Sequence, residues 1–387
     1  MSEAPAAGFF RGSERLEPIP ALGRLIRKGS PAELAVSDAD RVRAALRARD
    51  AQLATGYLSI VRSSAEMMVT SYVEFVLAFA PALAAHDPPI DHADIYRRAH
   101  DTWRRAVEAS PELGGSGAAT NSDVRQVAAA LGPDTVLPST VGEMRQALMS
   151  GGRTRAADLL VGPAADFERL SAALAAGDVA GAAAAFEDYY GRMRRLHDLL
   201  VELDSLLISV IAETCGSSVA GEILYQSFTG CLFYGGLWQL AGAMSAEELA
   251  AFLADHMRGH FSGPARDGTI DIVEEEDRIR LVFGRCGSGA AMRRRARAGV
   301  PDAAAPLAQA ANVTWQRAGE VPGYCSHCAM NELEGVRRLG YPLMVTEFDP
   351  DPDKPCGWTI YRDPSFIPES YFRRIGQKKD PSRFPAR

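Results

Sequence analysis

The residues best suited to chemistry lie between positions 284 and 362, where four of the six cysteines of the chain occur. Cys325 and Cys328 are separated by two residues, and His327 lies between them. Two thiols at this spacing can share one metal ion, and a tetrahedral zinc site then needs two further donors. Cys286 and Cys356 can provide them, with His327 as a substitute for one sulfur. We therefore predict that Cys286, Cys325, Cys328 and Cys356 bind zinc or another divalent metal.

Two other roles for these cysteines remain open. They can act as catalytic or substrate-contacting thiols, or they can lie in the core without any chemistry. For the catalytic role we predict Cys286 and His327 as the reacting residues. Cys286 is expected to end a strand, while Cys325 and Cys328 begin a helix. Because strand ends and helix starts collect at one rim of a small sheet, we expect the three thiols to converge.

The segment from Cys286 to Gly289 has the composition of a strand-to-helix turn. Its glycines allow backbone N–H groups to converge, and the following helix adds the positive end of its dipole. Such a turn binds carboxylate or phosphate and lowers the pKa of a neighbouring thiol. An arginine run after the turn can clamp the anion, or it can be a solvated basic helix face. The predicted substrate-binding residues are Gly287, Ser288, Gly289, Arg293 and Arg294.

Three of the histidines on predicted helices are candidates for a site. His256 and His260 are four residues apart, so they share a helix face at metal-ligand spacing. With no third ligand nearby in the sequence, we expect two exposed or locally bonded histidines at a helix end. His197 lies on a long apolar helix beside Asp198. We expect a core histidine there, with a role in lining a pocket as the alternative.

The chain divides into four parts by composition. Residues 1–36 contain four prolines and predict a surface arm. Residues 37–160 form a predicted helical domain, with one long helical stretch at about 40–85. Residues 161–262 are predicted to be helices that pack on a sheet domain. Residues 263–387 are the cysteine-rich part, and they end in a basic, proline-rich tail.

The periodicity of apolar residues changes after Gly263 and Pro264. Before this point it is helical, and we expect no strand in residues 1–262. After it, residues 269–274, 278–284, 341–348 and 357–362 alternate as strands do. The predicted fold class is α+β, with an N-terminal helical bundle followed by a small antiparallel sheet that has helices on one side.

Composition and charge limit the class of protein. The net charge is −7, which disfavours nucleic-acid binding because phosphate contacts need a basic face. Residues 66–85 approach the composition of a membrane span but contain Glu66, Glu74 and Pro81, so we predict a buried helix and no membrane association. The first residues lack the pattern of a signal peptide, which predicts a cytoplasmic protein with reduced cysteines. No motif for a nucleotide cofactor occurs, and the helical half can form a homodimer interface.

The order of parts in residues 185–362 resembles the L-2-amino-thiazoline-4-carboxylic acid hydrolase family and, beyond it, the vinyl-reductase-type small-ligand domains. The similarity consists of a helix pair that breaks at Cys215 and Gly216, a strand that ends at Cys286, a helix start at Cys325, and a strand pair with a cysteine after its turn. The chain departs from the family pattern at Cys328, where we expect an acidic residue, and in its Gly-Ser-Gly turn and arginine run.

The resemblance implies a small-molecule hydrolase or lyase that acts on a C–N bond, or a relative that only binds a ligand. Together with the predicted anion site, it leads us to expect an enzyme that cleaves or rearranges a C–N bond in a carboxylate-bearing nitrogen compound. The alternative is a non-catalytic sensor or accessory protein that binds a ligand or metal and has a structural zinc site.

Overall fold

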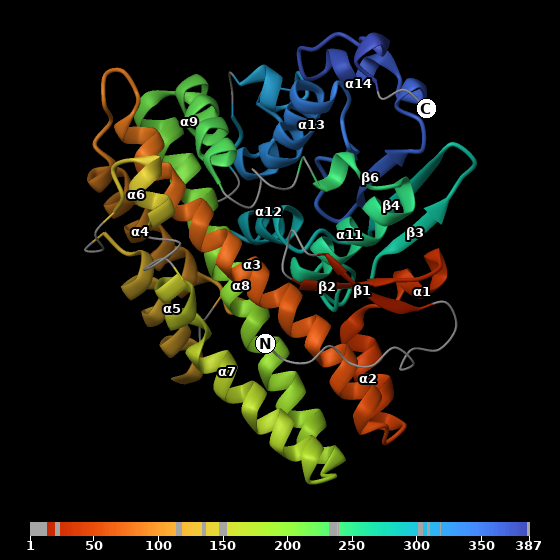
Figure 1. The fold of residues 1–387 in the computed structure, drawn as a ribbon. Coiled ribbons are helices and arrows are strands. Elements are labelled where there is room, and N and C mark those ends of the chain that lie inside the picture. Colours follow the sequence, from red (N-terminus) through yellow and green to blue (C-terminus); the bar gives the residue numbers. More distant parts are fainter. Residues whose placement is uncertain are drawn as a thin grey trace.

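The computed structural model describes residues 14–19, 24–113, 118–133, 137–146, 153–231, 238, 240–300, 305–307, 310–317 and 319–384. Helices dominate the chain up to residue 259, and the main sheet follows them (Figure 1). The helices of the first part are α1 (Pro31–Ala35), α2 (Asp38–Arg47), α3 (Ala51–Ala84), α4 (His92–Ala109), α5 (Ala118–Leu131), α6 (Val141–Gln146), α7 (Arg153–Ala175), α8 (Val179–Cys215), α9 (Ser217–Gly230) and α11 (Ala246–Gly259).

Two long helices, α3 and α8, pack against each other through the centre of the molecule (Figure 1). By length and hydropathy α3 could cross a membrane, but 83% of its apolar window is buried inside the protein. The prediction of a buried helix at 66–85 is therefore confirmed. The helical stretch predicted at 40–85 is instead two helices, because Arg49 adopts a left-handed φ of 58° and Asp50 caps α3 by accepting from the Leu53 N–H.

The expectation of no strand before residue 262 is wrong. Strands β1 (Arg15–Ile19) and β2 (Arg24–Lys28) form an antiparallel hairpin. Charged residues and Pro18 hide the alternation that would reveal these strands. Within the predicted surface arm, Ile26 and Arg27 are fully buried, because β2 packs against α11 and α3.

The four-stranded sheet confirms the predicted α+β class. It comprises β3 (Asp271–Glu274), β4 (Arg278–Phe283), β5 (Val345–Glu347) and β6 (Cys356–Tyr361). The strands lie in the order β3-β4-β6-β5, and every neighbouring pair is antiparallel. In the register of β4 and β6, Phe283 is opposite Cys356. The end of one strand and the start of the other therefore share an edge of the sheet.

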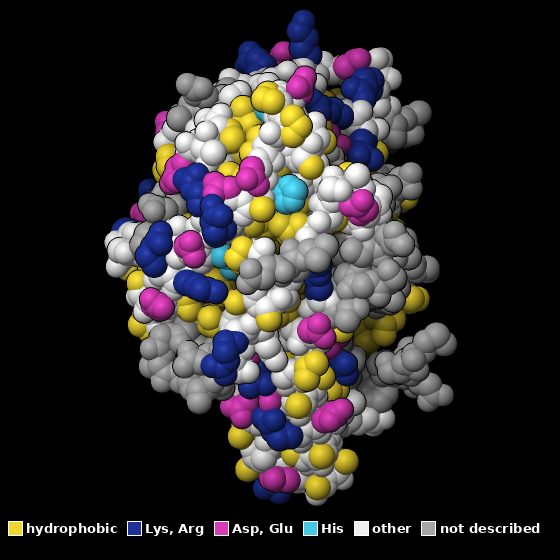
Figure 2. All heavy atoms as spheres, turned by 90° about the vertical axis from the view of Figure 1, so that its left-hand side faces the viewer, with side chains coloured by type: hydrophobic (Ala, Val, Ile, Leu, Met, Phe, Trp, Pro, Cys, Tyr) yellow, Lys and Arg dark blue, Asp and Glu magenta, His cyan; other side chains and the backbone are white. Residues whose placement is uncertain are grey.

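Three further helices are described in the same part of the chain as this sheet. Helix α12 (Gly289–Arg297) follows β4, α13 (Ser326–Leu339) precedes β5, and α14 (Glu369–Arg373) lies near the C-terminus. Helix α11 packs against β4 and β6 and also against α3. It thus joins the helical part to the sheet. Figure 2 shows that the opposite, helical side of the molecule carries acidic and basic side chains interspersed with hydrophobic groups.

Candidate functional site

A cavity lies between the sheet edge, α3, α11, α12 and α13. Its volume is about 90 Å³, measured as the space open to the centre of a water molecule. The lining is mainly apolar and aromatic, with side chains that include Tyr72, Phe252, Phe283, Trp315 and Trp358. A largely apolar cavity with a few convergent polar groups is the usual form of a small-molecule site.

The structure brings the four predicted cysteines together at this cavity. Cys286 follows β4, Cys356 begins β6, and Cys325 and Cys328 lie at the start of α13; all four line the cavity. The convergence follows from the register described above, since β4 and β6 meet at that edge. All six cysteines of the chain are free thiols.

Burial keeps three of the cavity thiols in the protonated form. It raises the pKa of Cys325 to about 12, and it raises the pKa values of Cys328 and Cys356 as well. Within the described ranges, no group of three or more His, Cys, Asp or Glu side chains is placed to hold a metal ion. Metal binding by Cys286, Cys325, Cys328 and Cys356 stays a prediction.

Cys286 has different surroundings from the other three. Its Sγ lies 3.5 Å from the Ser288 Oγ, within hydrogen-bonding distance for sulfur. It also interacts electrostatically with the guanidinium groups of Arg266 and Arg294. A guanidinium group also neighbours Cys325 and Cys356, in both cases that of Arg293. Cys286 is set apart by the Ser288 hydroxyl group, which joins it to the tyrosines and histidines described below.

The glycine turn serves packing more than anion binding. The Gly287 N–H donates to the Ser262 Oγ at 3.2 Å, and a Cβ at Gly287 would lie 1.8 Å from the carbonyl oxygen of His260. A Cβ at Gly289 would lie 2.8 Å from the Cys325 Sγ. Ser288 and Gly289 line the cavity, whereas Gly287 does not. Glycine is thus needed where the turn passes α11 and α13.

The two arginines predicted to hold the substrate donate to backbone carbonyl groups. Arg293 lines the cavity, but its Nη1 donates to the carbonyls of Asp349 and Pro350 at 2.8 and 2.9 Å. Arg294 does not line the cavity and donates to the carbonyl of Pro352 at 2.9 Å. Both side chains therefore hold the loop before β6.

A chain of hydrogen bonds connects His197, His260 and His256. On the sequence alone, His197 was considered separately from the other two. Arg266 binds both carboxylate oxygens of Asp198, and Asp198 accepts from the His197 Nδ1 at 2.9 Å. Since Nδ1 carries the proton, the His197 Nε2 accepts from the His260 Nδ1 at 3.2 Å. The His260 Nε2 then faces the His256 Nε2 at 3.1 Å. Burial lowers the pKa values of His197 and His260, which keeps both rings neutral.

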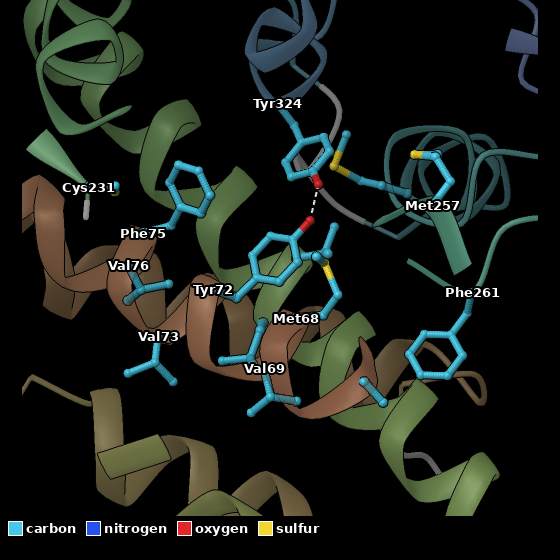
Figure 3. Close-up of a cluster of buried hydrophobic side chains, with 14 of the residues drawn as sticks. Met68, Val69, Tyr72, Val73, Phe75, Val76, Cys231, Met257, Phe261 and Tyr324 are labelled. Atoms are coloured by element: carbon cyan, nitrogen blue, oxygen red, sulfur yellow. Dashed lines mark hydrogen bonds between the residues drawn. The ribbon is translucent and has the colours of Figure 1, made fainter. Parts of the chain in front are cut away.

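Two tyrosines extend this chain toward Cys286. Tyr72 on α3 and Tyr324 before α13 point toward each other, and their hydroxyl groups form a hydrogen bond (Figure 3). The Tyr72 hydroxyl is also 3.3 Å from the His260 Nδ1. Tyr324 bonds in turn to the Ser288 side chain, which neighbours the Cys286 Sγ. Because the His260 Nδ1 carries its proton, it donates to the Tyr72 hydroxyl oxygen as well as to the His197 Nε2. Hydroxyl groups both donate and accept, so Tyr72, Tyr324 and Ser288 can relay the proton of the Cys286 thiol.

His327, the other predicted catalytic residue, lines the cavity from α13. Its ring packs against Phe75 and Tyr324, each with a centroid distance of 5.1 Å. Burial lowers its pKa to about 4, so the ring is neutral near pH 7. It bonds to the backbone of Tyr324. The hydrogen-bonded chain from Asp198 reaches Cys286 without it.

Sequence reasoning missed Tyr72, Tyr324 and Arg266, and it underestimated the histidines. His260, expected to be exposed or bonded locally, joins His197 on a different helix. The four-residue spacing of His256 and His260, and the adjacency of His197 and Asp198, are the signals that could have found the chain. No protein-family model, curated protein or solved structure matches this chain. The resemblance to the thiazoline-carboxylate hydrolase family therefore stays a prediction.

Proposed function

We propose that this protein is an enzyme that cleaves a C–N bond in a small molecule, with Cys286 as the nucleophile. The observation that carries the proposal is the continuous hydrogen-bonded chain from Asp198 through His197, His260, Tyr72, Tyr324 and Ser288 to Cys286. The neutral histidines orient the hydroxyl groups of this chain, and the Ser288 hydroxyl beside the Cys286 Sγ can relay the thiol proton as the sulfur attacks. The cavity gives the substrate a mainly apolar environment.

The proposed reaction begins when the Cys286 thiol passes its proton to the Ser288 hydroxyl group, the nearest member of the hydrogen-bonded chain. The thiolate attacks the carbon of a C–N bond at the carbonyl oxidation level, which forms an S–C bond. The C–N bond breaks, and the leaving nitrogen takes a proton from the chain. Water then hydrolyses the S-acyl intermediate, releases the acid and returns a proton to the sulfur. A substrate carboxylate is not part of this proposal, because Arg293 and Arg294 bind backbone carbonyl groups.

The proposal is tested by the rate at which iodoacetamide alkylates each cysteine, measured over a range of pH by mass spectrometry of the peptides. Cys286 should react faster than Cys328 and Cys356, which also line the cavity. Tyr72→Phe keeps the ring but breaks the chain. It should slow the alkylation of Cys286 several-fold and move its pH profile upward.

Cys215 is a matched control, because it is partly exposed and lies at the end of α8, outside the cavity lining. Its alkylation rate should be the same in the wild type and in Tyr72→Phe. Equal rates for Cys286 and the other cavity thiols, or an unchanged pH profile in Tyr72→Phe, would rule out the proposed role of the chain.

A further inference from the structure

The cavity has polar atoms on its α13 and β5 side that the hydrogen-bonded chain does not use. The His327 Nε2, the Asn331 Oδ1 and the Thr346 Oγ1 are buried and have no hydrogen-bond partner among the described residues. The three residues line the cavity and are 9%, 7% and 3% exposed. A buried polar atom without a partner costs about 1–3 kcal/mol. Three such atoms on one wall therefore indicate a place where a ligand forms the missing bonds.

The hydrogen-bonding character of two of these atoms can be assigned. The Asn331 Nδ2 donates to the carbonyl of His327 at 3.0 Å, and a flipped amide would place two oxygens against each other. The Asn331 Oδ1 is therefore the atom that faces the ligand, and it only accepts. His327 bonds to the Tyr324 backbone, and because its Nε2 is the unpaired nitrogen, the bond uses Nδ1. A neutral ring protonated at Nδ1 leaves Nε2 as a second acceptor.

These residues are held rigidly. His327 and Asn331 are one turn apart on α13, and the His327 ring lies between aromatic side chains. The Thr346 N–H donates to the Glu332 Oε1 at 2.7 Å, while Arg374 binds both Glu332 and the Thr346 carbonyl. A rigid pair of acceptors loses little entropy on binding and selects for ligand geometry.

We propose that His327, Asn331 and Thr346 form a subsite for adjacent N–H donors on a planar, mostly apolar small molecule, such as a cyclic urea or lactam. The two acceptors on this wall can each accept from an N–H group of a ligand. Trp315, Phe348 and Trp358 line the same cavity and suit a flat ligand body. The inference rests on the proposed function only in that the ligand is the substrate of Cys286.

The test uses two compounds of nearly the same shape. Benzimidazolin-2-one has two N–H groups, and indan-2-one has CH₂ groups in their place. Binding to the full-length protein is measured by calorimetry. We expect the wild type to bind the cyclic urea at least tenfold more tightly, because an acceptor that stays unpaired in a complex weakens binding. In Asn331→Leu and His327→Phe the preference should fall to about threefold or less, while the affinity for indan-2-one changes little.

Cys286→Ala separates this inference from the proposed reaction, since the donor preference should persist in that variant even if Cys286 proves unreactive. Thr359→Val, a buried threonine on β6 that does not line the cavity, is the control and should keep the wild-type preference. Equal affinities of the wild type for the two compounds, or no measurable binding of either, would overturn the subsite. So would an unchanged preference in both Asn331→Leu and His327→Phe.

Discussion

Arg27 and Asn331 are both buried polar residues, but their surroundings differ. The Arg27 side chain donates to Asp38 and Glu14 at 2.6 Å each and to two backbone carbonyls. On the cavity wall, the Asn331 Oδ1 and the Thr346 Oγ1 have no partner among the described residues. We call the surroundings of Arg27 the closed region, because the protein itself supplies the hydrogen-bond partners there. We call the wall formed by His327, Asn331 and Thr346 the open region, because a ligand can supply the missing partners.

Buried polar groups with partners and those without partners affect stability and ligand binding differently. A buried ion pair whose hydrogen bonds are all formed holds its elements in place, here the β1–β2 hairpin against α2. A wall with unpaired acceptors lowers stability and gains binding energy only when a ligand arrives. The two regions should therefore respond in opposite ways when a polar side chain is replaced by an apolar one.

The largest loss of stability should come from Arg27→Met. The substitution leaves the carboxylates of Glu14 and Asp38 buried without Arg27, and breaking such a pair costs about 3–5 kcal/mol. Urea denaturation should show this loss of unfolding free energy. Arg97→Met, which removes an exposed pair with Asp94, should change stability by less than about 1 kcal/mol. A similar effect of both substitutions would refute the structural role of Arg27.

Asp204 on α8 is another buried polar residue whose side-chain oxygens lack a hydrogen-bond partner among the described residues, and it carries a carboxyl group. Burial raises its pKa from 3.8 to about 8. The folded state thus binds a proton more tightly than the unfolded state, so this group destabilises the fold progressively as pH rises from about 4 to about 8.

Asp204→Asn should remove that pH dependence and raise the unfolding free energy at pH 8.5 by about 5 kcal/mol. Near pH 4 the variant and the wild type should have similar stability, since the group is protonated in the folded wild type. Chemical denaturation at the two pH values measures the difference. A variant that is less stable than the wild type at pH 8.5 would show that the carboxylate has a stabilising partner.

The closed and open regions also differ in how far the sequence predicted them. The meeting of the four cysteines follows from strand ends and a helix start, which local periodicity reveals. The hairpin at β1 and β2 was missed because charged residues such as Arg27 occupy positions where a core residue is expected. The chain from Asp198 to Cys286 joins residues up to 252 positions apart, as for Tyr72 and Tyr324, and no spacing rule reaches that far. The sequence also cannot show that polar atoms of His327, Asn331 and Thr346 lack hydrogen-bond partners, because this depends on which groups surround them after folding.

Gly289→Ala tests how tightly the open region is packed. The added Cβ would lie 2.8 Å from the Cys325 Sγ, so either the Cys325 side chain or the start of α12 must shift. We expect a loss of about 2 kcal/mol, typical of overpacking in a filled core. Gly56→Ala in the interior of α3 is the control, because no atom lies within 4 Å of its added Cβ. It should stabilise the protein by about 0.5–1 kcal/mol. Equal effects in thermal unfolding would argue against close packing at Gly289.

The smallest effect should come from Thr346→Val, and its sign is the informative part. The substitution keeps the shape of the side chain and removes a hydroxyl group that is buried without a partner. We therefore expect a gain of about 1 kcal/mol in unfolding free energy, together with weaker binding of the cyclic urea. Ser64→Ala provides the contrast, because the Ser64 hydroxyl donates to the Asp255 carboxylate at 2.6 Å in the interior, and its loss should destabilise the protein. If Thr346→Val also destabilises, the hydroxyl has a partner within the protein, and the wall is closed in the same way as the surroundings of Arg27.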